Sequence, residues 1–174
     1  MLIALLAFAL LGLTACGADG EKENIPGAAP APAPPVSREM VKPTVAGTKL
    51  IPKVVTASKT DPGGDPPHVS DGDVMTSWNA GDRAPQWILI DLGAPTSISD
   101  ILLNPNQTPD GPSTHRLYGG PTPDNLKLLG TLDGNTQNNQ WIEHKVAAND
   151  IRYLKIETVT SPSWVSWREI EIYK

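Results

Sequence analysis

A chain of 174 residues has room for one domain of ordinary size and some additional segments, since a domain takes roughly 100–200 residues. The formal net charge of −5 and the lack of a basic run exclude nucleic acid as the expected partner. The 18 Pro and 15 Gly residues favour turns and a linker over long helices. The single cysteine excludes a disulfide within the chain.

The first 13 residues are almost wholly apolar and lead into the sequence Leu13-Thr14-Ala15-Cys16. This run is shorter than the roughly 20 residues of a membrane-spanning helix and suits the apolar region of a signal peptide. The four residues resemble the lipobox of bacterial lipoproteins, which implies a leader over 1–15, cleavage before Cys16 and lipidation of that cysteine. No Lys or Arg precedes the run. An ordinary secretory leader cut nearby, or an uncleaved apolar end, therefore stays an alternative.

The residue after the cysteine is Gly17. In Gram-negative lipoproteins an Asp at this position directs retention at the inner membrane, so the resemblance implies an anchor in the outer membrane. A single acyl chain binds a membrane only marginally, whereas several chains anchor a protein stably. The expected location is therefore the bacterial cell envelope, with Cys16 holding the chain to the membrane.

Residues 16–48 are polar and rich in Pro and Ala, most densely between Pro26 and Pro35. Proline interrupts helices, and a segment without large apolar side chains has little to bury. We predict a disordered, flexible linker of extended polyproline II character that adds about 3 Å per residue. The alternative is a docking role for its prolines, or a contact with peptidoglycan.

From residue 49 to the C-terminus, short apolar runs alternate with turn residues. Several runs end at turn signals such as Gly-Ala-Pro or Asp-Gly-Asn, and others alternate with a period of two, as half-buried strands do. No stretch of ten or more residues has the helical period. The domain over 49–174 is therefore predicted to be an all-β sandwich. The predicted strands include 87–92, 98–103, 126–132, 152–157 and 169–173.

Four motifs of this domain resemble, in order, those of the discoidin family, which includes the coagulation factor V/VIII type C domains and the family-32 carbohydrate-binding modules. They are DGDVMTSW at 71–78, QWILIDLG at 86–93, IRYLKI at 151–156 and WVSWREIEIY at 164–173. The resemblance implies a discoidin-like jelly-roll β-sandwich with its ligand site in loops at one end. It is less specific about the ligand, because one fold hosts many functions.

The resemblance also implies a structural calcium ion in the loop around Asp71. Calcium takes roughly six to eight oxygen ligands, mixing carboxylates with backbone carbonyls. The alternative is a metal-free loop in which Asp71 only accepts hydrogen bonds from turn amides. The implied ligands are carboxylates of Asp71 and Glu169, a hydroxyl and carbonyl of Thr76, and backbone carbonyls of His68 and Asp73.

The resemblance places Trp78, Trp87 and Trp167 in the core, whereas Trp141 fits either the core or the surface. Trp164 is the aromatic ligand candidate, because an exposed ring in that loop can stack on a sugar or enter a partner's pocket. Sugars also need hydrogen-bonding groups beside an apolar face. The polar ligand candidates are Asn79, Asp82, Arg83, Asn106, Gln107 and Asp110.

Galactose-binding relatives commonly carry an arginine just before the strand that here begins near Thr114. This chain has Gly111-Pro112-Ser113 there, which argues against galactose-type recognition. The three histidines lack metal-ligand spacing, and no phosphate loop precedes a helix, so we predict a binding module without enzyme activity. The expected partner is a glycan; the alternative is a structural or protein-interaction role in an envelope or secretion complex. Phospholipid binding would need apolar loop residues, and these loops are rich in Pro, Asp and Asn.

Overall fold

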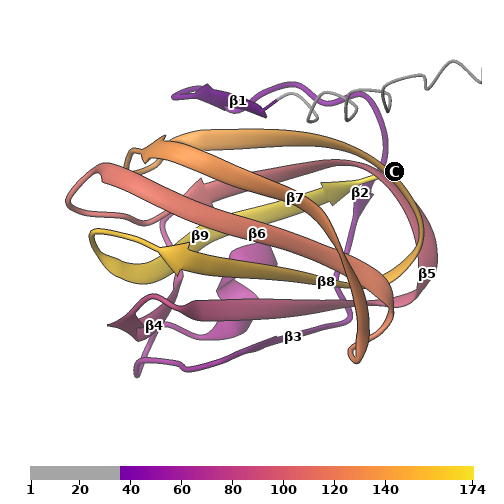
Figure 1. Ribbon diagram of the computed structural model, residues 1–174, viewed down its shortest axis with the longest axis horizontal. Helices are drawn as coiled ribbons and strands as arrows, with labels where there is room; N and C mark the ends of the chain where they lie inside the picture. The colour runs from indigo at the N-terminus through magenta and orange to yellow at the C-terminus, as the bar shows by residue number, and fades with distance from the viewer. Residues whose placement is uncertain (1–35) are drawn as a thin grey trace, which may run out of the picture. The chain divides into compact units, whose positions relative to one another are not determined.

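The computed structural model describes residues 36–174, and these form an antiparallel β-sandwich, so the predicted all-β class is confirmed (Figure 1). Within that range no helix is long and apolar enough to cross a membrane. The elements are β1 (Val36–Glu39), β2 (Lys49–Leu50), β3 (Val54–Ala57), the 3₁₀ helix η1 (Pro66–Ser70), β4 (Trp78–Arg83), β5 (Gln86–Pro105), β6 (Gly111–Thr122), β7 (Asn125–Thr136), β8 (Trp141–Thr160) and β9 (Trp164–Tyr173).

Two strands of 20 residues each, β5 and β8, bend and take part in both layers of the sandwich. Their first pairing runs from Gln86 to Asp91 of β5, in the layer that also contains β3, β6 and β7. Register shifts follow, and β5 then pairs with β8 and β9 in the layer that also contains β1, β2 and β4. Arg152 of β8 holds the bend by two hydrogen bonds to the Asp91 carboxylate, at 2.9 and 3.0 Å.

The core lies between the two layers, where alternate side chains of each strand point inward. Its largest buried side chains are Trp78 and Trp167, which are register partners on β4 and β9. The core prediction is therefore confirmed for these two. It is wrong for Trp87, which is half-buried and lies on the outer face, because its neighbour Ile88 takes the inward position. Trp141 is buried, with the Lys42 ammonium 5.3 Å from its ring centre.

Strand β1 lies inside the range 16–48 that the sequence predicts as a flexible linker. It pairs with β8 from Val36↔His144 to Glu39↔Trp141. The nearby ammonium groups of Lys42 and Lys49 each lie 2.7 Å from a carboxylate oxygen of the buried Glu171. The linker prediction is therefore wrong for residues 36–39, and ordered structure begins before residue 49. The predicted leader, Cys16 and the chain up to residue 35 lie outside the described residues.

Candidate ligand-binding site

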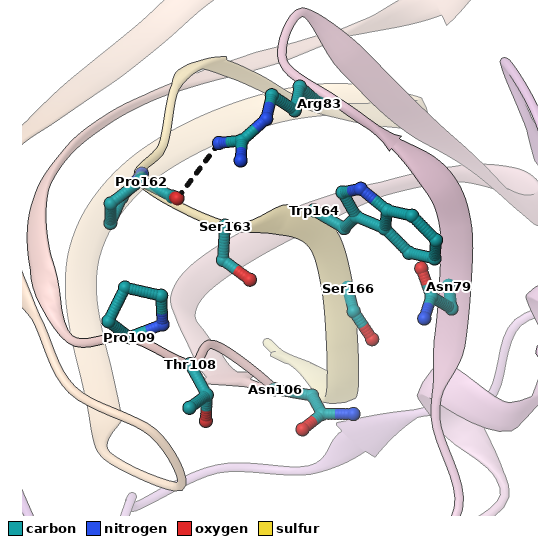
Figure 2. Close-up of a pocket in the computed structure, with 9 residues that line it drawn as sticks. All are labelled: Asn79, Arg83, Asn106, Thr108, Pro109, Pro162, Ser163, Trp164 and Ser166. Carbon is teal, nitrogen blue, oxygen red and sulfur yellow. Dashed lines mark hydrogen bonds between the residues drawn. The ribbon is translucent and has the colours of Figure 1, made fainter.

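Three chain segments meet at one end of the sandwich, on the left of Figure 1: the end of β4, the β5–β6 connection and the β8–β9 connection. Together they enclose an open hollow of about 410 Å³ (Figure 2). Its lining residues are Asn79, Arg83, Asn106, Thr108, Pro109, Pro162, Ser163, Trp164 and Ser166.

Trp164 is the aromatic residue among those that line the hollow. It is the first residue of β9 and the register partner of Arg83 on β4. Half of its surface is exposed (50%), whereas the next aromatic residue of the strand, Trp167, is buried in the core. An exposed ring beside polar groups is the arrangement that stacks against the face of a sugar.

Asn79 enters the hollow from β4 at an irregularity in the strand, where the register shifts between Asn79 and Arg83. Its side-chain oxygen accepts a hydrogen bond from the Gly81 amide at 2.9 Å. Gly81 has φ +64°, and a Cβ there would lie 2.9 Å from the Asp61 carboxylate, so glycine is required at this position. The turn thus fixes the Asn79 amide group with its N–H donors available to a ligand.

Asn106 lines the same hollow, but its amide group is already engaged on both sides. Its Oδ1 accepts a hydrogen bond from Arg168 at 3.0 Å, and its Nδ2 donates to the Ser77 hydroxyl at 3.1 Å. Arg168 also donates to the backbone carbonyl of Val74 at 3.0 Å. Asn106 therefore braces the floor of the hollow and connects it to the loop that follows η1.

Arg83 lies at the rim of the hollow, where its guanidinium donates to the carbonyl of Pro162 at 3.0 Å (Figure 2). This bond spans from β4 to the β8–β9 connection. Among the described residues that line the hollow, Arg83 is the one with a charged side chain. The rim therefore combines one cation with an aromatic ring and several neutral polar groups.

Of the seven predicted ligand residues, the structure brings together Asn79, Arg83, Asn106 and Trp164, and leaves three outside the hollow. Asp82 faces Lys59 at 2.8 Å, and the hydrogen bond from that ammonium lowers the pKa of the carboxyl. Gln107 is buried and binds Thr136 and Ser113, and Asp110 accepts the amide of Asn138. Sequence reasoning missed five lining residues, although each lies close in sequence to a predicted one: Thr108, Pro109, Pro162, Ser163 and Ser166.

The loop of residues 71–76, here the Asp71 loop, lies between η1 and β4 and carries the predicted calcium ligands. Asp71 accepts hydrogen bonds from the Asp73 amide and the Thr76 hydroxyl, both at 2.8 Å. The amide of Gly72 donates to Oε1 of Glu169, on β9, at 2.7 Å. The positive φ of Gly72 (+85°) permits the turn that makes this contact. The structure thus brings Asp71, Thr76 and Glu169 together.

The oxygen donors of this loop fit a hard cation. Glu169 is 1% exposed, and its Oε2 has no hydrogen-bond partner among the described residues. Burial raises the pKa of Glu169 to about 7, and the nearby charge of Asp71 acts in the same direction. A cation would satisfy the unpaired oxygen and relieve the repulsion between the carboxylates. Within residues 36–174 no group of three or more His, Cys, Asp or Glu side chains is placed to hold a metal, so carbonyl and hydroxyl oxygens would complete the set.

The sequence model of the F5/8 type C domain matches residues 54–170, which is more than half of the chain. The chain therefore belongs to the F5/8 type C, or discoidin, domain family. The predicted family resemblance is confirmed by this match. The comparison with curated proteins found no match.

Solved structures of carbohydrate-binding modules, including modules of family 32, share the fold. The module of AlyQ in complex with 4,5-unsaturated mannuronic acid has 24% identity and a TM-score of 0.62, covering 72% of this chain and 98% of its own. The module of C. perfringens NanJ in complex with galactose has 17% identity and a TM-score of 0.64, covering 74% of this chain and 100% of its own. Chitosan-binding module 2 from a Paenibacillus sp. IK-5 chitosanase/glucanase, with chitotriose, has 22% identity and a TM-score of 0.61, covering 72% and 98%. AlyQ also has an alginate lyase domain, and the Paenibacillus module derives from a chitosanase/glucanase.

Proposed function

We propose that this chain is a carbohydrate-binding module, held at the bacterial cell envelope by a lipid anchor at Cys16, that binds glycan in the hollow. The observation that carries the proposal is the half-exposed ring of Trp164, set beside free amide donors of Asn79 in an open hollow of about 410 Å³. Modules of the same fold have been solved with mannuronate, galactose and chitotriose bound, which supports a sugar as the ligand class.

The chemistry of the hollow suits a sugar ring. Trp164 offers a flat apolar face for the C–H groups of the ring, while Asn79 and Ser163 offer hydrogen bonds to its hydroxyls (Figure 2). The hollow is open to solvent at the end of the sandwich, so a longer glycan can pass through it. In this proposal the chain acts by binding and has no enzyme activity of its own.

The anchor is proposed from the lipobox at Leu13-Thr14-Ala15-Cys16, with Gly17 favouring the outer membrane. The residues between Cys16 and β1 would then serve as a spacer of roughly 60 Å, at about 3 Å per residue. Mass spectrometry of the membrane-extracted protein should find an acylated Cys16 at the N-terminus. An unmodified Cys16, or a mature terminus elsewhere, would refute the anchor.

We also propose that the Asp71 loop binds calcium. Asp71, Thr76 and Glu169 would hold the ion, together with the backbone carbonyls of His68 and Asp73. The ion would join the loop to β9 through Glu169 and complete the loop's oxygen set, with no part in any reaction. The loop also positions the Val74 carbonyl that Arg168 binds, so the ion supports the floor of the hollow indirectly.

The ligand class is tested by a glycan array and a membrane pull-down, each with Trp164→Ala, Trp164→Phe and Leu128→Ala. Leu128 is the matched control, because it is another exposed large apolar residue (56%) on a different part of the sandwich. Trp164→Ala should weaken glycan binding by about 1–3 kcal/mol, Trp164→Phe by less, and Leu128→Ala not at all. Capture of an envelope protein through Trp164, with no glycan bound, would instead support the protein-interaction role.

A further inference from the structure

The hollow differs in charge from the rest of the molecule. The chain holds 19 acidic residues against 14 basic ones, yet no carboxylate is among the described residues that line the hollow. The two acidic residues among the predicted ligands have other partners: Asp82 faces Lys59, and Asp110 accepts the amide of Asn138. Arg83 is therefore a cation at the rim without an acidic partner in the hollow.

The guanidinium of Arg83 is held in place by a hydrogen bond and keeps further N–H donors for a ligand. A guanidinium carries five N–H donors, and one of them binds the Pro162 carbonyl at 3.0 Å. Figure 2 shows the group at the edge of the hollow, above Ser163 and turned toward Pro162, with the Trp164 ring on the other side. Arg83 and Trp164 are register partners on adjacent strands, and both line the hollow, so a ligand there has access to the guanidinium and to the aromatic ring.

The other polar groups of the hollow also favour a ligand that accepts hydrogen bonds. The Asn79 oxygen already accepts a hydrogen bond from the Gly81 amide, whereas its two N–H donors have no partner among the described residues. The Asn106 oxygen is occupied by Arg168, a second guanidinium behind the floor of the hollow. A ligand in the hollow thus meets free N–H donors and an uncompensated positive charge.

We propose that the hollow selects glycans whose sugars carry a carboxylate, that is, uronic acids, and that Arg83 determines this specificity. This inference rests on the proposed carbohydrate-binding function. A carboxylate matches the planar donor fork of a guanidinium, which a neutral sugar hydroxyl cannot do. The sugar ring stacks on Trp164 while its carboxylate meets the free N–H donors of Arg83.

The test uses the purified full chain in detergent and affinity electrophoresis in gels that contain polygalacturonate, alginate or hyaluronan. Each polymer is compared with its carboxyl-reduced form, in which the same chain carries hydroxymethyl groups. At least one polyuronate should bind about tenfold or more tightly than its reduced form, since charge-assisted hydrogen bonds supply that range. Equal binding of both forms would overturn the inference. A sulfated galactan that binds better than every polyuronate would also overturn it.

Three variants separate specificity from loop support. Arg83→Gln should lower the affinity for the polyuronate by about 10- to 100-fold and leave the affinity for the reduced polymer unchanged. The affinity of Arg83→Lys for the polyuronate should lie between those of the parent chain and Arg83→Gln, because lysine keeps the positive charge but lacks the planar pair of N–H donors. Arg116→Gln, an exposed arginine of β6 outside the hollow, should match the parent chain. If Arg83→Gln weakens both polymers equally, Arg83 is only a brace for Pro162 and the inference is wrong.

The two proposals fail in different ways. Binding of neutral glycans through Trp164, without preference for a carboxylate, would leave the carbohydrate-binding function standing and refute the role of Arg83. Binding of no polysaccharide at all, charged or reduced, with Trp164 required for capture of a protein, would refute the carbohydrate-binding function itself.

Discussion

Strands β4 and β9 build two different regions of the molecule along a single pairing. At one point Trp78 lies opposite Trp167, and both are buried in the core. A few residues away Arg83 lies opposite Trp164, and both are exposed at the hollow. The change occurs at the register shift in β4, so one pair of strands carries both the packing and the proposed binding surface. Substitutions in the two regions should therefore affect different properties.

The largest effect is expected in the core, from Trp78→Ala. Trp78 is completely buried and its indole N–H donates to the Lys59 carbonyl at 3.0 Å. Its removal should lower the free energy of unfolding by about 3–5 kcal/mol, which denaturant titration measures. Trp164→Ala should change the same quantity by less than about 1 kcal/mol. Similar losses for the two variants would mean that Trp164 belongs to the core.

The pH dependence of stability tests the boundary between core and hollow. His115 is buried beneath the hollow, with its ring centre 4.9 Å from that of Trp167 and its Nδ1 3.1 Å from the Thr158 hydroxyl. Burial lowers the pKa of His115 from its ordinary 6.5 to about 4. As the pH falls, His115 is therefore protonated in the unfolded chain at a higher pH than in the folded chain, and stability is lost between pH 6.5 and 4.

That loss should be about 3 kcal/mol, at roughly 1.4 kcal/mol for each unit of pKa, and should level off below pH 4. His144 is also buried with a lowered pKa and acts in the same direction. The measured quantity is therefore the difference between the parent chain and His115→Gln in denaturant titrations from pH 7 to pH 4. Parallel curves for the two chains would show that His115 is not buried in its neutral form.

The strands of this fold could be predicted because their evidence is local. Alternation within 152–157 and 169–173 reflects the two faces of a strand. The same rule identifies Trp87 as an outward residue, since Ile88 and Ile90 take the inward positions. The prediction that Trp87 lies in the core was instead made from its position in the family motif, and it is wrong. Strand β1 had no such evidence, because its four residues form a strand only through pairing with β8, over 100 residues later.

The candidate site could be predicted only as a set of loops. Sequence identifies which loops follow which strands, and this was enough to bring Asn79, Arg83, Asn106 and Trp164 together. It does not fix the direction of each side chain within a loop. Gln107 turns inward to satisfy the Thr136 carbonyl, while its neighbours Asn106 and Thr108 line the hollow. The direction of such a side chain depends on hydrogen-bond partners that lie far away in the sequence.

Removal of calcium is the next largest test, and it concerns the Asp71 loop beside the hollow. An ion that binds only the folded chain adds about 2.7 kcal/mol of stability at a hundredfold excess over Kd. Chelator should therefore lower the melting temperature of the parent chain measured by calorimetry. Asp71→Asn should abolish the difference between calcium and chelator, whereas Asp82→Asn, whose carboxylate faces Lys59, should preserve it. An identical melt of the parent chain with and without chelator would establish the metal-free loop.

The smallest expected effects separate two asparagines within the hollow. The N–H donors of Asn79 are free for a ligand, so Asn79→Ala should weaken glycan binding by about 1 kcal/mol, the net contribution of one hydrogen bond. The side-chain amide group of Asn106 is hydrogen-bonded to Arg168 and Ser77. Asn106→Ala should therefore lower the free energy of unfolding by about 1 kcal/mol, with binding retained once the chain is folded. Titration calorimetry and denaturant melts of both variants measure the two quantities. Because the two residues are of the same type and line the same hollow, the reverse result would show that Asn106 contacts the ligand and Asn79 supports the turn at Gly81.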